Sequence, residues 1–259
     1  MTQRRVLVVE HEADVDLALI GQRLDAHGVA VHIVGPERGV EIPASLDEFD
    51  GFVVLGGRMD PDDDAGAPWL PAVRALLGEA VRRQVPTMGV CLGAQLLGMT
   101  VGGTVRTIPA GPEVGLHLME PTASAAADPV LRHLPAPGRR ALSWHWWEVT
   151  DLPEVCDGHP ITHLAASSAC PVQAFAVGER VWGLQFHLEA LGRTARTWGA
   201  SNPQRLVDIG LDPDALIRSV QCAEPELVAS WSPVIDAWIA IVVGGPDRAR
   251  ADNGALTTR

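Results

Sequence analysis

The segment GVCLGAQ at residues 89–95 decides the fold of this 259-residue chain, because it puts a cysteine where a short apolar strand gives way to a helix. A sharp turn from strand to helix crowds the backbone and needs small residues on each side, as Gly89 and Gly93 provide. The first amides of the helix are unpaired and lie at the positive end of its dipole, which favours the thiolate of Cys91. A buried cysteine taken alone is more often inert packing, so this candidate nucleophile needs a partner.

Apolar runs and helical patterns alternate on both sides of this segment. Leu17, Ile20 and Leu24 share one face of a predicted helix, which Gly28 ends. Runs that are apolar throughout and alternate with helices are typical of parallel strands covered on both faces. The sequence therefore predicts an α/β fold, a single domain with a mostly parallel central sheet and helices on both faces. The expected strands are 6–9, 29–34, 52–55 and 86–90, and the expected helices are 14–26, 71–83 and one directly after Cys91.

The second half of the chain is less regular. Residues 102–141 are broken by proline and glycine, which predicts hairpins and surface loops added to the main sheet. Two apolar runs, 172–176 and 181–186, are separated by Gly178 and predict a β-hairpin that delivers His187 at its end.

The C-terminal region predicts two helices, over 206–219 and 225–242, that pack on the outside of the sheet. Trp231, Trp238 and Ile241 mark the apolar face of the second helix. Residues 1–243 are expected to form one domain, with its C-terminal helices within 203–243. Residues 244–259 contain almost no apolar side chains and are expected to be a flexible tail.

Composition excludes several classes of partner. The chain has 20 basic against 32 acidic residues, a net charge of -12, and no basic cluster, so neither nucleic acid nor an anionic membrane is an expected partner. The four cysteines are sparse and irregularly spaced, unlike a secreted disulfide framework, which favours a reducing cytoplasm. The N-terminal apolar stretch is too short for a signal or a membrane span.

The segment GLQFHLE at 183–189 supplies the partner that Cys91 needs. His187 ends a predicted strand and Glu189 follows two residues later, so that in an extended chain both side chains point the same way. The carboxylate could then orient the imidazole while its other nitrogen faces the thiol. A histidine near a glutamate is common by chance. The pair indicates a catalytic site only in combination with the strand-to-helix turn at Cys91.

These two segments together resemble the class I glutamine amidotransferases, whose glutaminase domain carries a GxCxGxQ turn and, near its end, a QFHPE-like segment. The resemblance covers roughly residues 4–190 and is closest to stand-alone proteins like the glutaminase domain of GMP synthase. It implies a flavodoxin-like fold, no cofactor, and a reaction in which Cys91 attacks the side-chain carbonyl of glutamine. His187 would be the general acid and base, and Glu189 would orient it.

The resemblance also assigns residues around the substrate. The backbone N–H groups of Gly57 and Leu92 would stabilise the oxyanion, an effect of roughly 3 to 4 kcal/mol per donor. The expected substrate contacts are Gln95, Gly56 and the backbone near Trp146 and Trp147.

Four positions depart from the family pattern. Leu188 stands where proline is usual and could loosen the turn at His187. Arg58 follows the glycine pair Gly56 and Gly57 and adds a charge beside the oxyanion site. Trp146 and Trp147 replace a small and an acidic residue common in close relatives, a change that falls on substrate binding rather than on the catalytic residues.

Three alternatives remain open at this stage. No phosphate-cradling or nucleotide-binding motif follows residue 190, so we expect that the ammonia passes to a separate synthase, or that the enzyme is a γ-glutamyl peptidase that uses the same triad. A non-catalytic regulatory homologue is a third alternative, against which the intact triad argues.

A metal site is not expected. The candidate ligands match no zinc spacing, and His159 is expected in a loop; these candidates are Cys156, His159, His163 and Cys170. His117 and His145 are expected to be structural or surface residues rather than catalytic ones, with His145 near the pocket.

Overall fold

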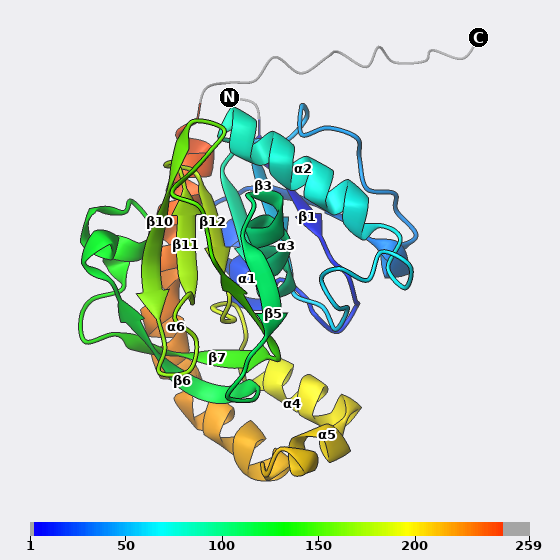
Figure 1. The fold of residues 1–259 in the computed structure, drawn as a ribbon, viewed down its shortest axis with the longest axis vertical. Helices are drawn as coiled ribbons and strands as arrows, with labels where there is room; N and C mark the ends of the chain where they lie inside the picture. The colour runs from blue at the N-terminus through cyan, green and yellow to red at the C-terminus, as the bar shows by residue number, and fades with distance from the viewer. Residues whose placement is uncertain (1–2, 246–259) are drawn as a thin grey trace.

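The computed structural model describes residues 3–245, which form a ten-stranded sheet flanked by helices and a small two-stranded sheet (Figure 1). The ten-stranded sheet has the order β2-β1-β3-β4-β12-β11-β10-β6-β7, with β9 beside β10, and β5 pairs with β8. The strands are β1 (Arg5–Val9), β2 (Ala30–Val34), β3 (Gly51–Val54), β4 (Thr87–Val90), β5 (Thr104–Thr107), β6 (Glu113–Pro121), β7 (Arg139–His145), β8 (Trp147–Thr150), β9 (Val155–Cys156), β10 (His159–Ala166), β11 (Ala174–Val177) and β12 (Val181–Leu184).

The sheet is parallel from β2 to β12 and antiparallel beyond. This confirms the α/β fold, with hairpin strands extending a parallel core. The helices are α1 (Ala18–Ala26), α2 (Leu70–Arg83), α3 (Leu92–Thr100), α4 (Gly192–Ser201), α5 (Pro203–Asp208) and α6 (Pro213–Val243), with short 3-10 turns η1 (Pro36–Arg38), η2 (Ala123–Ala127) and η3 (Leu131–His133).

Helices cover both faces of the parallel strands because those strands are apolar on both sides. Side chains alternate between the faces of a strand. In β3, Val53 joins the core under α1 and α6, whereas Phe52 and Val54 join the core under α2 and α3. All three side chains are fully buried. The continuous apolar runs of the sequence therefore contribute side chains to two hydrophobic cores, one on each face of the sheet.

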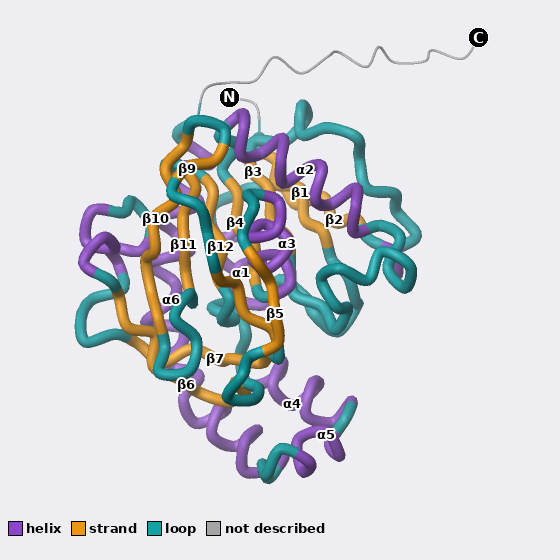
Figure 2. The backbone as a smooth tube through the Cα atoms, in the orientation of Figure 1, coloured by secondary structure: helices purple, strands orange, loops and turns teal. Residues whose placement is uncertain are grey.

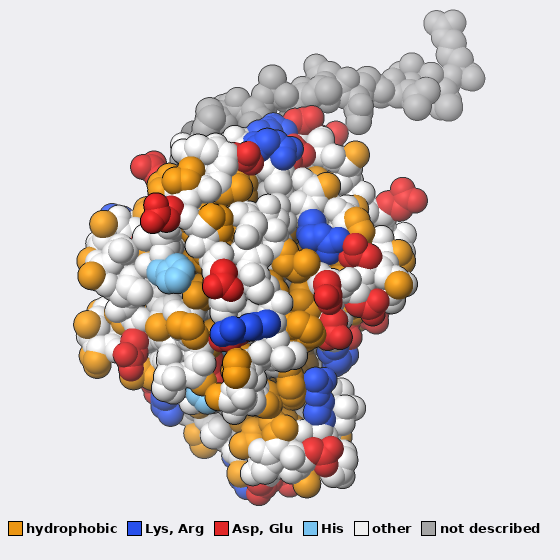
Figure 3. Space-filling model, in the orientation of Figure 1, with side chains coloured by type: hydrophobic (Ala, Val, Ile, Leu, Met, Phe, Trp, Pro, Cys, Tyr) orange, Lys and Arg blue, Asp and Glu red, His pale blue; other side chains and the backbone are white. Residues whose placement is uncertain are grey.

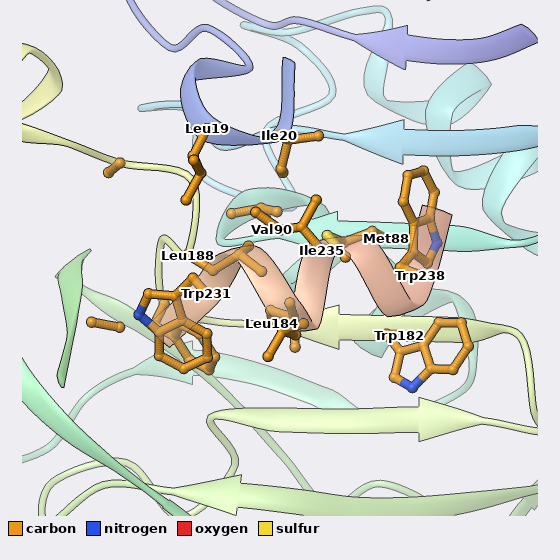
Figure 4. Close-up of a cluster of buried hydrophobic side chains, with 14 of the residues drawn as sticks. Leu19, Ile20, Met88, Val90, Trp182, Leu184, Leu188, Trp231, Ile235 and Trp238 are labelled. Atoms are coloured by element: carbon orange, nitrogen blue, oxygen red, sulfur yellow. The ribbon is translucent and has the colours of Figure 1, made fainter. Parts of the chain in front are cut away.

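Helix α6 is the central helix of one core. Trp231, Ile235 and Trp238 point from it toward the sheet, where Trp182 and Leu184 of β12 meet them (Figure 4). The 31 residues of α6 are also long and apolar enough to cross a membrane by length and composition, which is weak evidence because core helices pass the same test. Its buried side chains here pack on the sheet.

The prediction of separate helices over 206–219 and 225–242 is wrong. The first range spans the end of α5, a turn through Gly210 with φ 81° and the start of α6. Pro225, taken as a helix start, lies inside α6. The apolar face runs through it from Ala223 to Leu227, both of which are buried, and this packing keeps the helix continuous across the proline.

Three other segments differ from expectation. Helix α1 begins at Ala18 rather than at 14, because the Asp16 carboxylate accepts its N–H at 3.2 Å. His159 begins strand β10 and not a loop, because it pairs with Cys156 of the short strand β9. Helix α4 was not predicted at all. The expected tail, 244–259, lies outside the described residues apart from Gly244 and Gly245.

Helices α4 and α5 stand beyond the sheet at the end where β6 and β7 lie (Figure 2). The face seen in Figure 3 intersperses basic and acidic side chains with apolar ones and shows no continuous basic patch. Strands β4 and β12 are parallel neighbours, so the segments that follow them, which begin with Cys91 and run to His187, leave the same edge of the sheet.

Candidate active site

Cys91 occupies a tight turn between β4 and α3. Its backbone has φ 49° and ψ -105°, a conformation unusual for a residue with a side chain, and its N–H donates to the Leu184 carbonyl at 2.8 Å. A Cβ at Gly93 would lie 2.2 Å from the Val54 carbonyl oxygen, and one at Gly89 would lie 2.6 Å from the Gly93 oxygen. Both glycines are therefore required by close backbone approach, as the sequence predicted.

His187 and Glu189 lie together directly after β12. The imidazole Nδ1 is 2.8 Å from a Glu189 carboxylate oxygen, and both side chains are buried. The His187 N–H donates to the Leu142 carbonyl at 2.8 Å, which holds the turn. Leu188 is buried in the core, so the residue that replaces the family's proline anchors this turn instead of loosening it.

The structure brings Cys91 and His187 to one point above the sheet edge. A Cβ added at Gly56 would lie 2.9 Å from the His187 Cε1 and 3.5 Å from the Cys91 Cβ. Burial acts to lower the pKa of His187, but the negative charges of Glu189 and Cys91 and hydrogen bonds to both outweigh it and raise the pKa to about 10. The imidazole is therefore held as a cation beside the Cys91 sulfur at neutral pH.

The glycine loop beside Cys91 is fixed by ion pairs. The Arg58 N–H donates to a Glu12 carboxylate oxygen at 2.8 Å, and the Arg58 guanidinium pairs with Glu12 at 2.6 Å and with Asp14. Arg58 thus ties the loop to the segment after β1. Among residues 3–245, the N–H groups of Gly57 and Leu92 donate to no backbone or side-chain acceptor.

Gln95 reaches the cavity one helical turn beyond Cys91. It is 3% exposed, and its amide nitrogen donates to the Trp147 carbonyl at 3.3 Å and to the Gln185 side chain at 3.2 Å. The Trp146 carbonyl accepts the Ile108 N–H at 2.9 Å. The Trp147 indole donates to the Asp60 carboxylate at 3.0 Å, and both tryptophans line the cavity.

A buried polar cluster supports the tryptophan segment. The two ring nitrogens of His145 lie 2.9 Å from the Trp147 carbonyl and 3.1 Å from the Glu113 carboxylate. Ser167 donates to Glu113 at 2.6 Å. Burial acts to raise the pKa of Glu113, but the hydrogen bonds from His145 and Ser167 outweigh it and lower the pKa. His145 is thus a buried support that also lines the cavity, and His117 lies 3.6 Å from the same carboxylate.

The cavity over Cys91 unites segments from most of the chain. Its aromatic wall begins at His187, where Trp198 of α4 packs edge-on with a ring separation of 4.7 Å, and continues with Trp144, 5.6 Å from Trp198. The lining residues are Val15, Gly57, Arg58, Met59, Asp60, Cys91, Gln95, Trp144, His145, Trp146, Trp147, His187, Trp198, Ser201, Asn202, Arg205 and Leu206.

Sequence reasoning missed the part of this wall that α4 and α5 contribute. The residues concerned come after the GLQFHLE segment and belong to no sequence motif; they are Trp198, Ser201, Asn202 and Arg205. One local signal for the start of α4 was available. Thr194 is a residue type that can cap a helix from its first turn, and here its hydroxyl accepts the Leu191 N–H at 3.3 Å.

The four residues weighed as zinc ligands divide between separate surroundings. Cys156 faces His159 across the β9–β10 pair, whereas Cys170 is buried and bonds to the Val172 carbonyl at 3.6 Å. Burial raises the pKa of Cys170 to about 12, the opposite of what a metal thiolate needs. Across the described part of the chain, no three His, Cys, Asp or Glu side chains lie together in a way that could hold a metal ion.

Comparisons with known proteins agree with this architecture. A sequence model of the family described as Glutamine amidotransferase class-I matches residues 13–201. The glutamine amidotransferase-like protein YfeJ of Salmonella typhimurium is 30% identical over 188 residues, which cover 71% of this chain and 75% of that protein.

Two further relatives have different activities in their names. A glutamine-hydrolysing GMP synthase subunit of Halobacterium salinarum is 34% identical over 57% of this chain and 69% of its own length. Gamma-glutamyl peptidase 3 of Arabidopsis thaliana is 28% identical over 56% of each chain, so the match spans about half of that protein. A solved glutamine amidotransferase structure from Methylobacillus flagellatus shares the fold, with a TM-score of 0.82, 24% identity and coverage of 97% of this chain and 98% of its own.

Proposed function

The chain belongs to the class I glutamine amidotransferase family, and on that premise we propose that it hydrolyses the side-chain amide of glutamine through a thioester at Cys91. The observation that carries this proposal is the meeting of three groups at one sheet edge: the strained Cys91 turn, the buried His187 and the carboxylate of Glu189.

The proposed reaction has two steps. The Cys91 sulfur attacks the γ-carbonyl carbon, a C–S bond forms, and the C–N bond breaks as His187 gives its proton to the leaving ammonia. Water then attacks the thioester and gives a proton to His187, the C–S bond breaks, and glutamate leaves. Glu189 keeps the imidazole oriented throughout, through its contact with Nδ1.

Each step passes through an oxyanion. We assign its stabilisation to the N–H groups of Gly57 and Leu92, which flank Cys91 and have no acceptor among the described residues. Gln95, Gly56 and the backbone near Trp146 and Trp147 are proposed to surround the glutamyl part of the substrate, while the Trp146 indole faces Arg205. For Gly56 this means close approach, because a side chain there would collide with His187.

The experiment that tests the function measures ammonia and glutamate released from glutamine. Cys91→Ser should lower kcat by at least about 10³-fold, as loss of a covalent nucleophile does, and should abolish labelling by a glutamine-like chloroketone. Cys222→Ser is the matched control, because Cys222 is exposed on α6. Absence of turnover and of labelling in the unaltered protein, alone and with candidate synthases, would favour a non-catalytic homologue.

A γ-glutamyl peptidase is the second candidate, favoured by the aromatic cavity wall. Ammonia is small, whereas Trp144, Trp146 and Trp198 line space beside His187 that an amine with a side chain could occupy. The relative named gamma-glutamyl peptidase 3 supports the same alternative. Comparing glutamine with γ-glutamyl dipeptides as substrates separates the two.

We also propose the setting in which the enzyme works. As a glutaminase it would give its ammonia to a separate synthase, as the name of the related GMP synthase protein suggests. Residues 1–243 are proposed to act as one domain. All four cysteines are free, in keeping with a reducing cytoplasm.

A further inference from the structure

The proposed chemistry divides the cavity into a glutamyl side and a leaving-group side. His187 must face the departing nitrogen to protonate it, so the leaving group lies toward the side chains that pack on His187. Trp198 is in contact with that ring, and Trp144 is in contact with Trp198. The leaving-group side is therefore the aromatic wall supplied by β7 and α4.

This wall continues to Arg205 on α5. Trp144 and Trp146 both pack against a small apolar cluster that includes Leu206. The guanidinium carbon of Arg205 lies 3.7 Å from the centre of the Trp146 ring, a close cation-π stack, and both residues line the cavity that holds Cys91.

Arg205 differs from the other arginine of the cavity in its charge balance. Arg58 is neutralised by Glu12 and Asp14. The Arg205 guanidinium makes no ion pair with any side chain between residues 3 and 245, although acidic residues outnumber basic ones in the chain. Stacking on Trp146 fixes the plane of the guanidinium and leaves its N–H edge available to an acceptor.

We propose that Trp146 and Arg205 form a binding subsite for the leaving group of a γ-glutamyl compound, and that this group is an amino acid with an apolar side chain and a free carboxylate. The inference rests on the proposed cleavage of γ-glutamyl amide bonds. Ammonia has no atoms that could reach Arg205, and a cationic amine would be repelled by it. An apolar side chain would pack on the indoles, while the carboxylate accepts from the guanidinium.

The test compares γ-glutamyl-leucine with γ-glutamyl-leucinamide, which differ only in the charge of the terminal carboxyl. The purified protein should cleave the acid with a kcat/KM roughly tenfold higher than the amide, a modest value for a charge-assisted hydrogen bond at a partly exposed site. In Arg205→Gln this ratio should fall to about one. Arg196→Gln is the matched control, since Arg196 is an exposed arginine of the neighbouring α4 that does not line the cavity, and it should keep the ratio.

The possible outcomes separate this inference from the proposed function. Turnover of glutamine with no turnover of either dipeptide, or an equal rate for acid and amide, would overturn the subsite and leave the glutaminase intact. Absence of turnover of all three compounds would refute the proposed function. In that case calorimetric binding to Cys91→Ser still decides, because the subsite requires tighter binding of the acid than of the amide, lost in the double variant with Arg205→Gln.

Discussion

The charge state of His187 links residue-level geometry to catalysis. A buried histidine alone would be neutral, because burial disfavours its cation. Here Glu189 and Cys91 reverse that effect and raise the pKa to about 10. The proposed reaction uses this cation, since it is the proton donor for the leaving nitrogen. The same carboxylate therefore both orients the ring and sets the pH range of the enzyme.

Glu189→Gln should move the alkaline limb of the kcat/KM profile to lower pH. In the unaltered protein the folded-state pKa of His187 is raised from 6.5 to about 10, so its proton, and the activity and stability that depend on it, are fully present below about pH 6.5 and lost as the pH rises through 10. Glutamine at this position keeps a hydrogen bond but removes the charge. The profile of kcat/KM between pH 6 and 11 measures the shift.

Glu113→Gln serves as the comparison for this profile, because Glu113 is a second buried carboxylate paired with a histidine, His145. It should affect KM through the tryptophan segment and leave the alkaline limb in place. An alkaline limb that stays near pH 10 in Glu189→Gln would contradict the role given to Glu189.

A site residue could be predicted from the sequence where a reactive side chain occurs together with a local backbone pattern, such as a glycine turn or the end of a strand. Cys91 could be located because its turn also demands Gly89 and Gly93, and His187 because it follows the apolar strand β12 within three residues. Trp198 and Arg205 enter the same cavity from α4 and α5, and their types are equally suited to core and surface. Their placement depends on how α4 folds over the sheet edge, which no local pattern encodes.

At the scale of elements, the apolar runs predicted the parallel strands to within a residue or two. Strands β1, β3 and β4 are buried on both faces, which leaves a continuous apolar run as their signal, whereas the edge strand β2 is partly exposed. Helix ends were less predictable. Pro225 favours a helix start by its own chemistry, yet it lies inside α6 because packing of one continuous apolar face outweighs a missing hydrogen bond.

Asp212 marks the true start of α6 and offers a test of this element. Its carboxylate accepts the N–H groups of Asp214 at 2.9 Å and Ala215 at 3.2 Å. Asp212→Ala should lower the free energy of unfolding by about 1 kcal/mol, which corresponds to roughly 2 to 4 °C in Tm for a chain of this size. Thermal unfolding followed by circular dichroism measures this change.

Two further variants make the measurement specific to the cap. Asp212→Asn should keep nearly full stability, because asparagine caps helices as well as aspartate does. Asp208→Ala removes an equal charge at the end of α5, where the carboxylate meets only the Gln204 side chain. A loss in Asp208→Ala as large as in Asp212→Ala would show that charge, not capping, is responsible.

The whole molecule joins distant parts of the sequence in one sheet. Strand β12 pairs with β4 on one side and β11 on the other, so the hairpin that carries His187 completes a sheet begun near the N-terminus (Figure 1). Helix α6 then returns across that sheet and packs on α1. The site exists only when both halves are folded, because Cys91 comes from one half and His187 from the other.

Unfolding should therefore be a single cooperative transition, as the domain proposed for residues 1–243 requires. Far-ultraviolet circular dichroism reports the helices and the sheet, while fluorescence of the eight tryptophans, which include the buried Trp182, Trp231 and Trp238 of the core under α6, reports tertiary packing. In a urea titration the two signals should share one midpoint, because neither half can keep its core without the other. Two separated midpoints would show that the halves fold independently, and a site assembled from both would then depend on their docking rather than on one shared sheet.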